Sequence, residues 1–230
     1  TESLPIVSIE GRTIVDETWP ETKKGKGTCV GSAVPGVSIK IIKPTDSLLP
    51  TIDECTILEP GSCGEIIVKG DVVTRAYDGN EAQTMASKIK DDDGFWHRIG
   101  DVGYLDSQDR LWFCGRKAHR VFSRKGTMYT ICCEALVNNH PDVFRSALVG
   151  IDSGQEYQTA VMIIELHKPL TRKVEDVVNE VAGICARHPL LEIIEHVLVH
   201  ENFPVDIRHN AKIFREQLSV WAQQRVQKQS

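Results

Sequence analysis

The sequence has no excess of basic residues and no long apolar run, and both absences narrow the classes of protein to consider. Its 230 residues hold 27 Lys and Arg against 32 Asp and Glu, for a formal net charge of -5. Without a basic field, the chain is poorly suited to hold a nucleic acid backbone or an anionic membrane surface. No apolar stretch approaches the roughly 18 to 20 residues that cross a bilayer. We therefore expect a cytoplasmic protein with no nucleic acid partner and no membrane span.

The seven cysteines lack the spacing of a functional cluster. They include no CxxC pair and no Cys/His pattern of the kind that binds a metal, so we expect reduced and mostly buried thiols. The adjacent Cys132 and Cys133 are the one unusual feature. Free cysteines are most often simply buried, which favours packing over redox chemistry for this pair.

Two further absences concern the start of the chain and phosphate binding. The first residues, TESLPIVSIEGR, contain no Met, no basic region and no apolar core of a signal peptide. We expect them to follow a longer upstream segment. In addition, no segment is rich in Ser, Thr, Gly and Lys, the composition of a phosphate-binding loop. A phosphate loop is therefore not expected within these residues.

The first half of the chain is predicted to consist mainly of short strands. Residues 37–41 alternate apolar and polar side chains between a Pro-Gly turn and a proline, and residues 65–69 repeat this pattern between two glycine turns. Residues 104–113 have the pattern of a hairpin with a polar turn at 106–109. Short strands at close spacing favour a small β-barrel or sandwich. Residues 1–30 are polar and mixed, and no element is assigned to them.

Apolar residues at helical spacing appear alongside strand patterns only in the second half of the sequence. We therefore place a domain boundary at 116/117. The predicted elements are a short helix at 131–139, strands at 146–151 and 159–166, a helix capped by Thr171, a strand at 193–199 and a last helix at 213–225. The expected fold class is α+β, with a β-rich unit at 1–116 and an α+β unit at 117–230.

Several short motifs follow one another in a specific order. They are Thr1-Glu2, Gly64-Glu65, the run RIGD at 98–101, Gly115-Arg116, Glu134 and Asn210-Ala211-Lys212. In this order they resemble the second half of the adenylate-forming superfamily, which comprises acyl-CoA synthetases, luciferases and the adenylation domains of peptide synthetases. The stretches GRKAHRV, YTICCEAL and FPVDIRHNAKIFREQL are similar to one branch, the olefin-biosynthesis ligases that act as β-lactone synthetases.

The resemblance implies both a domain organisation and a chemistry. Residues 1–116 would be the C-terminal portion of the large adenylation domain, with a β-barrel-like fold, and residues 117–230 a small mobile α+β lid domain. The cofactors implied are ATP, AMP and Mg²⁺. The substrate implied is a carboxylic acid, for which we expect a fatty or 3-hydroxy fatty acid.

Asp101 is the first candidate for nucleotide binding. A carboxylate accepts two hydrogen bonds at once and can hold the vicinal hydroxyls of a ribose, and such charge-assisted bonds are strong. The alternative is that Asp101 only caps a hairpin at Gly103. Arg116 lies across the predicted hairpin and can return to the same sheet edge. The resemblance assigns Arg116 to the ribose and phosphates, with a surface salt bridge as its alternative.

Lys212 is the candidate catalytic residue. Adenylation brings a substrate carboxylate against the α-phosphate, and an ammonium on a long stem can bridge the two anions. By composition alone, Lys212 is one solvated charge among several at a helix start. Its place in the HNAKI motif, through the resemblance, is what singles it out.

The resemblance also assigns roles to residues at the start of the chain and at the domain boundary. Thr1 would meet the α-phosphate and Glu2 would help to hold Mg²⁺, although without a supporting strand both are expected to be frayed. Lys117 and Ala118 would form the hinge on which the lid rotates. The family usually has Asp or Lys where this chain has Ala118, which puts a full rotation in doubt.

Three histidines, His97, His119 and His209, lie near the candidate residues in sequence. No metal spacing supports them, and no partner that would orient a general base can be named. They are not assigned a role.

The function expected is that of an AMP-forming carboxylate ligase that makes an acyl-adenylate and closes it to a β-lactone. Two alternatives stay open. One is an acyl-CoA synthetase or a peptide-synthetase adenylation domain, and the other is a non-catalytic module that docks a pathway enzyme. These residues alone are expected to be inactive, since the phosphate loop would lie in the longer segment expected upstream of them.

Overall fold

The computed structural model describes residues 3–206 and 212–228, which divide into two compact units. Within this part of the chain, the first unit holds the residues up to Thr22 together with Lys26–Ala118. The second unit holds Lys23–Gly25 and the residues from His119 onward. Apart from the short segment Lys23–Gly25, the chain passes from the first unit to the second between Ala118 and His119.

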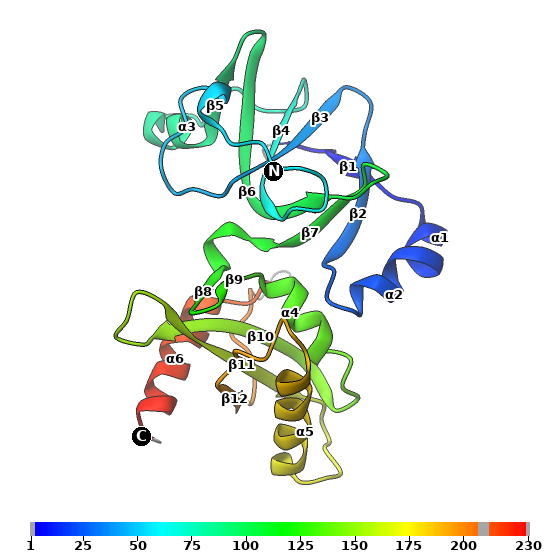
Figure 1. The fold of residues 1–230 in the computed structure, drawn as a ribbon, viewed down its shortest axis with the longest axis vertical. Helices are drawn as coiled ribbons and strands as arrows, with labels where there is room; N and C mark the ends of the chain where they lie inside the picture. Colours follow the sequence, from blue (N-terminus) through cyan, green and yellow to red (C-terminus); the bar gives the residue numbers. More distant parts are fainter. Residues whose placement is uncertain (1–2, 207–211, 229–230) are drawn as a thin grey trace. The chain divides into compact units, whose positions relative to one another are not determined.

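The first unit is built on one curled antiparallel sheet of seven strands (Figure 1). The strands are β1 (Val7–Ser8), β2 (Thr28–Ala33), β3 (Val37–Ile42), β4 (Gly64–Gly70), β5 (Lys88–Asp91), β6 (Gly94–Leu105) and β7 (Leu111–Arg116). Their order is β1-β2-β7-β6-β4-β3, with β5 also paired to β6. The long strand β6 therefore lies in the middle of the sheet and carries the RIGD motif.

Both faces of this sheet are covered, which explains the continuous apolar run in β4. Ile66 and Val68 join one cluster with Ile41, while Ile67 joins a second cluster on the other face with Trp96. Side chains alternate between the faces of a strand. A strand buried on both faces is therefore apolar at successive positions.

Short helices complete the first unit. They are α1 (Gly11–Thr13), a π-helical turn (Ile14–Thr18), α2 (Trp19–Thr22), a 3-10 turn (Ile52–Glu54), α3 (Glu81–Ser87) and a 3-10 turn (Lys117–His119) that leads out of the unit. The absence of any assigned element in residues 1–30 is wrong, because β1, α1, α2 and the start of β2 lie there. Elements of two to six residues are too short to show a hydrophobic period.

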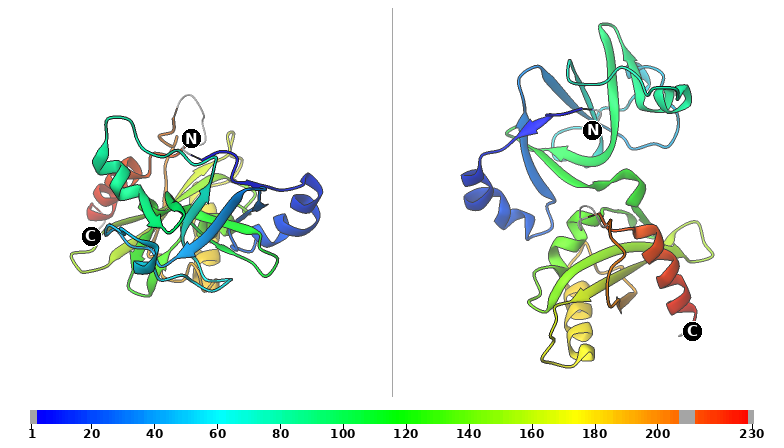
Figure 2. Two further views of the ribbon diagram at one scale, coloured as in Figure 1. Left: turned by 90° about the horizontal axis from the view of Figure 1, so that it is seen from above. Right: turned by 180° about the vertical axis from the view of Figure 1, so that it is seen from behind.

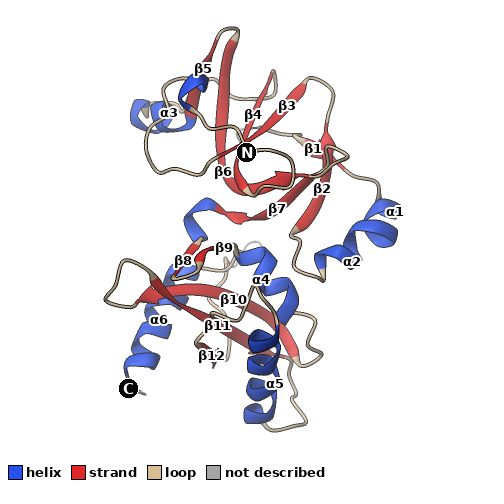
Figure 3. Ribbon diagram, in the orientation of Figure 1, coloured by secondary structure: helices blue, strands red, loops and turns tan. Residues whose placement is uncertain are grey.

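The second unit combines a small hairpin with a three-stranded sheet and three helices (Figure 3). The hairpin is β8 (Val121–Ser123) and β9 (Gly126–Met128), and the sheet is β10 (Val143–Asp152), β11 (Gln158–Leu166) and β12 (His196–Val199). The helices are α4 (Thr130–Val137), α5 (Val174–Arg187) and α6 (Arg215–Gln227). Strands β10 and β11 are antiparallel, and β12 runs parallel to β11.

Helices cover both faces of this sheet, as the two opposite views of Figures 1 and 2 show. Leu148 and Met162 face a core shared with α4 and α5, where they meet Val177 and Val181. The alternate residues of the same strands, such as Val149, face α6 instead. This two-sided burial accounts for the nearly unbroken apolar run of β11.

Several predicted boundaries in the second unit differ from the structure, and β10 begins at Val143, three residues before the predicted start. Helix α5 begins at Val174 with Lys173 at its N-cap and no side-chain cap, so Thr171 does not cap it. Strand β12 begins at His196, because the residues before it form hydrogen-bonded turns. Helix α6 begins at Arg215, because Ile213 pairs with Val205 in a β-bridge.

The α+β class with a β-rich first unit is nevertheless confirmed. Among the residues that the structure describes, no helix is both long enough and apolar enough to cross a membrane.

Candidate nucleotide-binding site

Asp101 and Arg116 face each other across the pair of strands β6 and β7. Their Cα atoms are direct partners in the strand register. The Nη1 atom of Arg116 lies 3.0 Å from Oδ1 of Asp101, and the exposed fractions of the two side chains are 58% and 22%. The hairpin therefore brings the two predicted residues to one edge of the sheet, with the carboxylate largely covered and the guanidinium largely in solvent.

The Asp101 carboxylate has unused hydrogen-bonding capacity. Its Oδ1 atom is buried, and the Arg116 guanidinium at 3.0 Å is the one described group that pairs with it. Gly103 donates no hydrogen bond to this oxygen. Burial raises the pKa of Asp101, and the nearby charge of Arg116 opposes the rise. A carboxylate with a single cationic partner keeps acceptor capacity that a ligand could use.

Gly100 gives this strand an unusual backbone at the site. Its φ angle is +76°, and an added Cβ would meet no atom within 4 Å. The conformation, and not lack of space, therefore selects glycine here. In contrast, a Cβ on Gly103 would lie 2.2 Å from the carbonyl oxygen of Trp112, so close approach of β6 and β7 excludes a side chain at that position.

Lys212 lies in the second unit, exposed, three residues before helix α6. Its carbonyl oxygen accepts a hydrogen bond from the Asp206 backbone N–H at 2.9 Å. Of the HNAKI motif, residues 209–211 lie outside the described residues. The same holds for Thr1 and Glu2, whose predicted contacts with phosphate and Mg²⁺ stay predictions.

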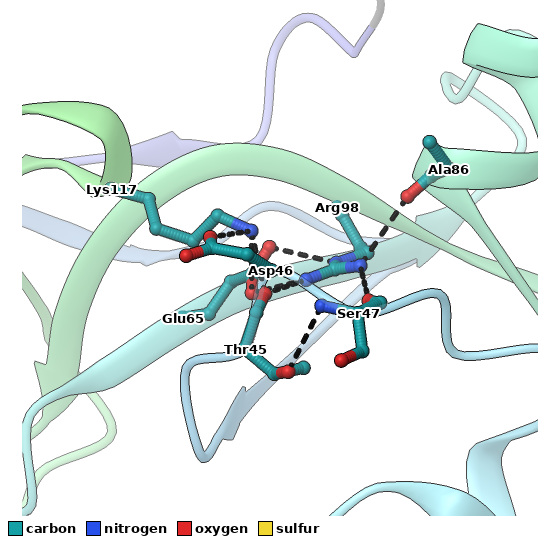
Figure 4. A network of polar contacts seen from close by, with 7 residues as sticks. All are labelled: Thr45, Asp46, Ser47, Glu65, Ala86, Arg98 and Lys117. Carbon is teal, nitrogen blue, oxygen red and sulfur yellow. Dashed lines mark hydrogen bonds and ion pairs between the residues drawn. The ribbon is translucent and has the colours of Figure 1, made fainter.

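Lys117 is tied to the sheet of the first unit through a buried carboxylate (Figure 4). Its Nζ lies 3.2 Å from Oε2 of Glu65 and donates to the Thr45 carbonyl at 2.9 Å. Glu65 is fully buried, and Arg98 grips it with Nε at 2.9 Å and Nη2 at 2.8 Å. Arg98 also donates to the carbonyl of Ser47, so one carboxylate organises two cations and a loop.

Sequence reasoning did not predict this network, although a signal was present. Glu65 stands directly before the apolar run of β4, and Arg98 lies within a strand whose neighbours are buried. A charged residue at a covered strand position is rarely stable alone, which indicates a paired partner.

Comparison with known proteins places the chain in a family. The olefin beta-lactone synthetase of Xanthomonas campestris pv. campestris is 43% identical over 98% of this chain, and that of Stenotrophomonas maltophilia is 41% identical over 100% of it. The solved o-succinylbenzoate CoA synthetase from Bacillus subtilis, in complex with an acyl-adenylate intermediate, has a TM-score of 0.68 at 23% identity and covers 93% of this chain and 38% of its own. The chain belongs to the adenylate-forming enzymes.

This assignment confirms the resemblance inferred from the motifs. The chain spans 42% of the length of each of the two curated relatives. No model of a protein family matches the sequence.

Of the three histidines singled out in the sequence, the two that the structure describes have local partners. His97 is buried, with Nδ1 3.2 Å from the Ser87 carbonyl, and Nε2 of His119 lies 3.3 Å from Oε1 of Glu216. His209 lies outside the described residues. Within the described ranges, no group of three or more His, Cys, Asp or Glu could hold a metal ion. All seven cysteines are free, and four of them are buried.

Proposed function

We propose that the protein carrying this chain uses ATP to activate a carboxylic acid, forming an acyl-adenylate and pyrophosphate. The observation that supports this best is the pairing of Asp101 with Arg116 at one edge of the sheet, where Arg116 is the one described partner of the carboxylate. A ribose supplies two adjacent hydroxyl donors, which match the two oxygens of a carboxylate. Arg116, more exposed, is placed to meet the negative charge of the phosphates.

Lys212 is proposed as the catalytic residue of this reaction. When the substrate carboxylate attacks the α-phosphate, negative charge builds between the two groups, and an ammonium placed there stabilises the transition state. The exposed side chain of Lys212 is free of the packing that would prevent it from reaching a ligand. Residues 117 and 118 are proposed as the hinge of the second unit, which would act as a lid.

The described residues support a site for the nucleotide but not one for Mg²⁺. The Asp101 carboxylate, with Arg116 beside it, fits a nucleotide ribose. For Mg²⁺, the proposed residues are Thr1 and Glu2, and the described residues contain no ligand cluster. No step is therefore assigned to the metal.

The substrate is proposed to be a fatty acid or a 3-hydroxy fatty acid that is closed to a β-lactone. Support comes from the two curated relatives, both named olefin beta-lactone synthetase. In this reaction the 3-hydroxyl of the substrate attacks its own acyl-adenylate, so no second substrate has to enter. Ala118, at the hinge position, fits a reaction that does not need a full rotation of the lid.

A CoA ligase is the second candidate, supported by an indoleacetate CoA ligase that is 29% identical over 81% of this chain. The product separates the two candidates. If AMP release requires coenzyme A, the enzyme forms a thioester, and if AMP appears without it from a 3-hydroxy acid, the enzyme forms the lactone.

The proposal is tested by ATP–pyrophosphate exchange in the full-length protein. Lys212→Ala and Asp101→Ala are each expected to lower the exchange rate by about 100-fold or more, the usual effect of removing a group that stabilises transition-state charge or holds the substrate. Lys173→Ala, at an exposed lysine of the same unit, is the control. Normal exchange by Lys212→Ala would contradict the proposal, and retention of a partner enzyme by that variant would favour a docking role.

Residues 1–230 by themselves are proposed to bind ATP weakly and to lack activity, because they contain no phosphate-loop composition. Calorimetric titration with ATP tests this. A micromolar dissociation constant would contradict it.

A further inference from the structure

The segment that carries Lys212 begins after Phe203 and ends before Arg215, and we call these two residues its first and second stems. A carboxylate of the sheet holds the first stem. The Phe203 backbone N–H donates to Oε2 of Glu165 at 2.8 Å. Glu165 belongs to β11, is 9% exposed at its side chain, and also pairs with Nε of Arg145 at 2.7 Å. Phe203 itself is buried in the core beneath α6. The chain therefore leaves the core at a point that is held by a buried, charge-assisted hydrogen bond.

The second stem is fixed by a carboxylate from a different element. Arg215, the first residue of α6, donates from Nη2 to Oε2 of Glu134 at 2.9 Å and from Nη1 to Oε1 at 2.5 Å. Glu134 lies on α4, is 6% exposed at its side chain, and also accepts the Leu148 backbone N–H at 2.8 Å. One carboxylate thus joins α4, the edge strand β10 and the start of α6.

Backbone hydrogen bonds continue from the stems to Lys212 itself. Phe214 donates to the Pro204 carbonyl at 2.9 Å, Val205 and Ile213 form a β-bridge, and Asp206 donates to the Lys212 carbonyl at 2.9 Å. The main chain of Lys212 is therefore tied on the side of the stems, while its side chain is exposed.

We propose that Glu134 and Glu165 are positioning residues for Lys212. A lysine side chain has four flexible bonds, so the accuracy with which it reaches a reacting group depends on how firmly its backbone is held. The two carboxylates hold the two stems from different elements, Glu165 from β11 and Glu134 from α4, and neither needs to touch the substrate. The inference rests on the role proposed for Lys212.

The kinetic test uses the full-length protein and compares Glu134→Gln, Glu165→Gln and Arg215→Lys. In Glu134→Gln and Glu165→Gln, the glutamine oxygen can still accept the hydrogen bond from the Leu148 or Phe203 N–H, but the negative charge is lost. In Arg215→Lys, the positive charge opposite Glu134 is kept, but the bidentate contact of the guanidinium is lost. Each variant is expected to lower kcat for adenylate formation about 10- to 100-fold, as misplacement of a reacting group does. The KM for ATP is expected to change less than about twofold, because Asp101 and Arg116 are unaltered. Glu180→Gln, which breaks an ion pair with Arg172 that touches neither stem, is the control.

A second measurement does not depend on activity. Amide hydrogen exchange at Asp206 and Phe214 in the same variants should become faster, while exchange at core amides such as that of Ile163 stays at the rate of the parent protein. A variant that exchanges faster everywhere is globally destabilised, and the conservative Arg215→Lys then decides the question. Wild-type kcat and wild-type exchange at Asp206 and Phe214 in a folded Arg215→Lys protein would overturn the inference. A normal kcat in Lys212→Ala would instead overturn the proposed function, so the two failures are distinguishable.

Discussion

The Nζ atom of Lys117 lies 3.2 Å from Oε2 of Glu65, the same oxygen that Arg98 holds from the other side at 2.8 Å. The two cations differ in importance. Arg98 is bidentate and its side chain is 6% exposed, whereas that of Lys117 is 17% exposed and also approaches Asp46. Arg98 therefore compensates the buried charge, while Lys117 fastens the last residues of the first unit to its sheet.

Lys117→Met and Arg98→Met should differ in their effect on stability. The lysine variant leaves Glu65 paired, so its free energy of unfolding should fall by about 1 kcal/mol. The arginine variant leaves a buried carboxylate with only one partner and should cost about 3 to 5 kcal/mol. Urea unfolding of both proteins measures this, with Lys69→Met, which breaks the Asp91 ion pair, as the control. Equal losses for the two variants would contradict the division of roles.

Because Lys117 is anchored, the proposed hinge should pivot at Ala118. Proline fixes φ near -65°, so Ala118→Pro is expected to slow at least one of the two half-reactions in the full-length protein, namely adenylate formation and the following step. Rapid-quench measurement of each step tests this. If both rates match those of the parent protein, Ala118 is not a hinge.

Asp101→Asn is expected to remove nucleotide binding without weakening the fold. The raised pKa of Asp101 means that burial disfavours its charged form. By linkage, this group stabilises the folded state most below the ordinary aspartate pKa and loses that contribution as the pH rises through its raised value. The neutral amide avoids this loss, so the free energy of unfolding at pH 7 should be equal or higher. A clear loss of stability would show that the Arg116 ion pair outweighs the burial of the carboxylate.

Asp106 should make the hairpin that carries Asp101 and Arg116 sensitive to acid. Burial opposes its ionisation, but hydrogen bonds from the Trp112 indole and from Arg110 and Gln108 hold the pKa of Asp106 at about 2. At about 1.4 kcal/mol per pKa unit, this lowered pKa stabilises the folded state by about 2 kcal/mol. The stabilisation is fully present above the ordinary aspartate pKa near 4 and is lost as the pH falls to 2. Asp106→Asn should therefore lower stability at pH 7 and flatten its dependence on pH between 4 and 2, measured by thermal unfolding. An unchanged dependence would contradict this.

Cys133 and Cys185 should be unreactive in the folded protein. Both are buried, and burial raises the pKa of the Cys185 thiol to about 11 and that of Cys133 well above its ordinary value. The thiolate is the reactive form, so iodoacetamide at pH 8 should label these residues only after unfolding. Labelling of Cys133 under native conditions, detected by mass spectrometry, would reopen a redox role for the adjacent pair at 132 and 133.

Long, periodic elements could be predicted from the sequence, and short or irregular ones could not. Strands β3, β4 and β11 and helix α5 were located to within a few residues, because each exposes a regular pattern of apolar side chains. The elements at 7–22 were missed because none is long enough to have a period. The prediction that Thr171 caps α5 was wrong, because the helix begins at Val174, after Lys173. The preference of threonine for the N-cap is a weak local signal, and the packing of α5 decided where the helix starts.

The sequence by itself determined the family, the two-part α+β organisation and the pairing expected between Asp101 and Arg116, since motif order and hairpin spacing are local properties of the chain. Only the tertiary structure decided which polar groups are satisfied. Glu65 meets Arg98 across 33 positions and Glu134 meets Arg215 across 81, and no local pattern encodes such pairs. Burial makes each of these charges require a partner, and only the folded chain brings that partner within reach.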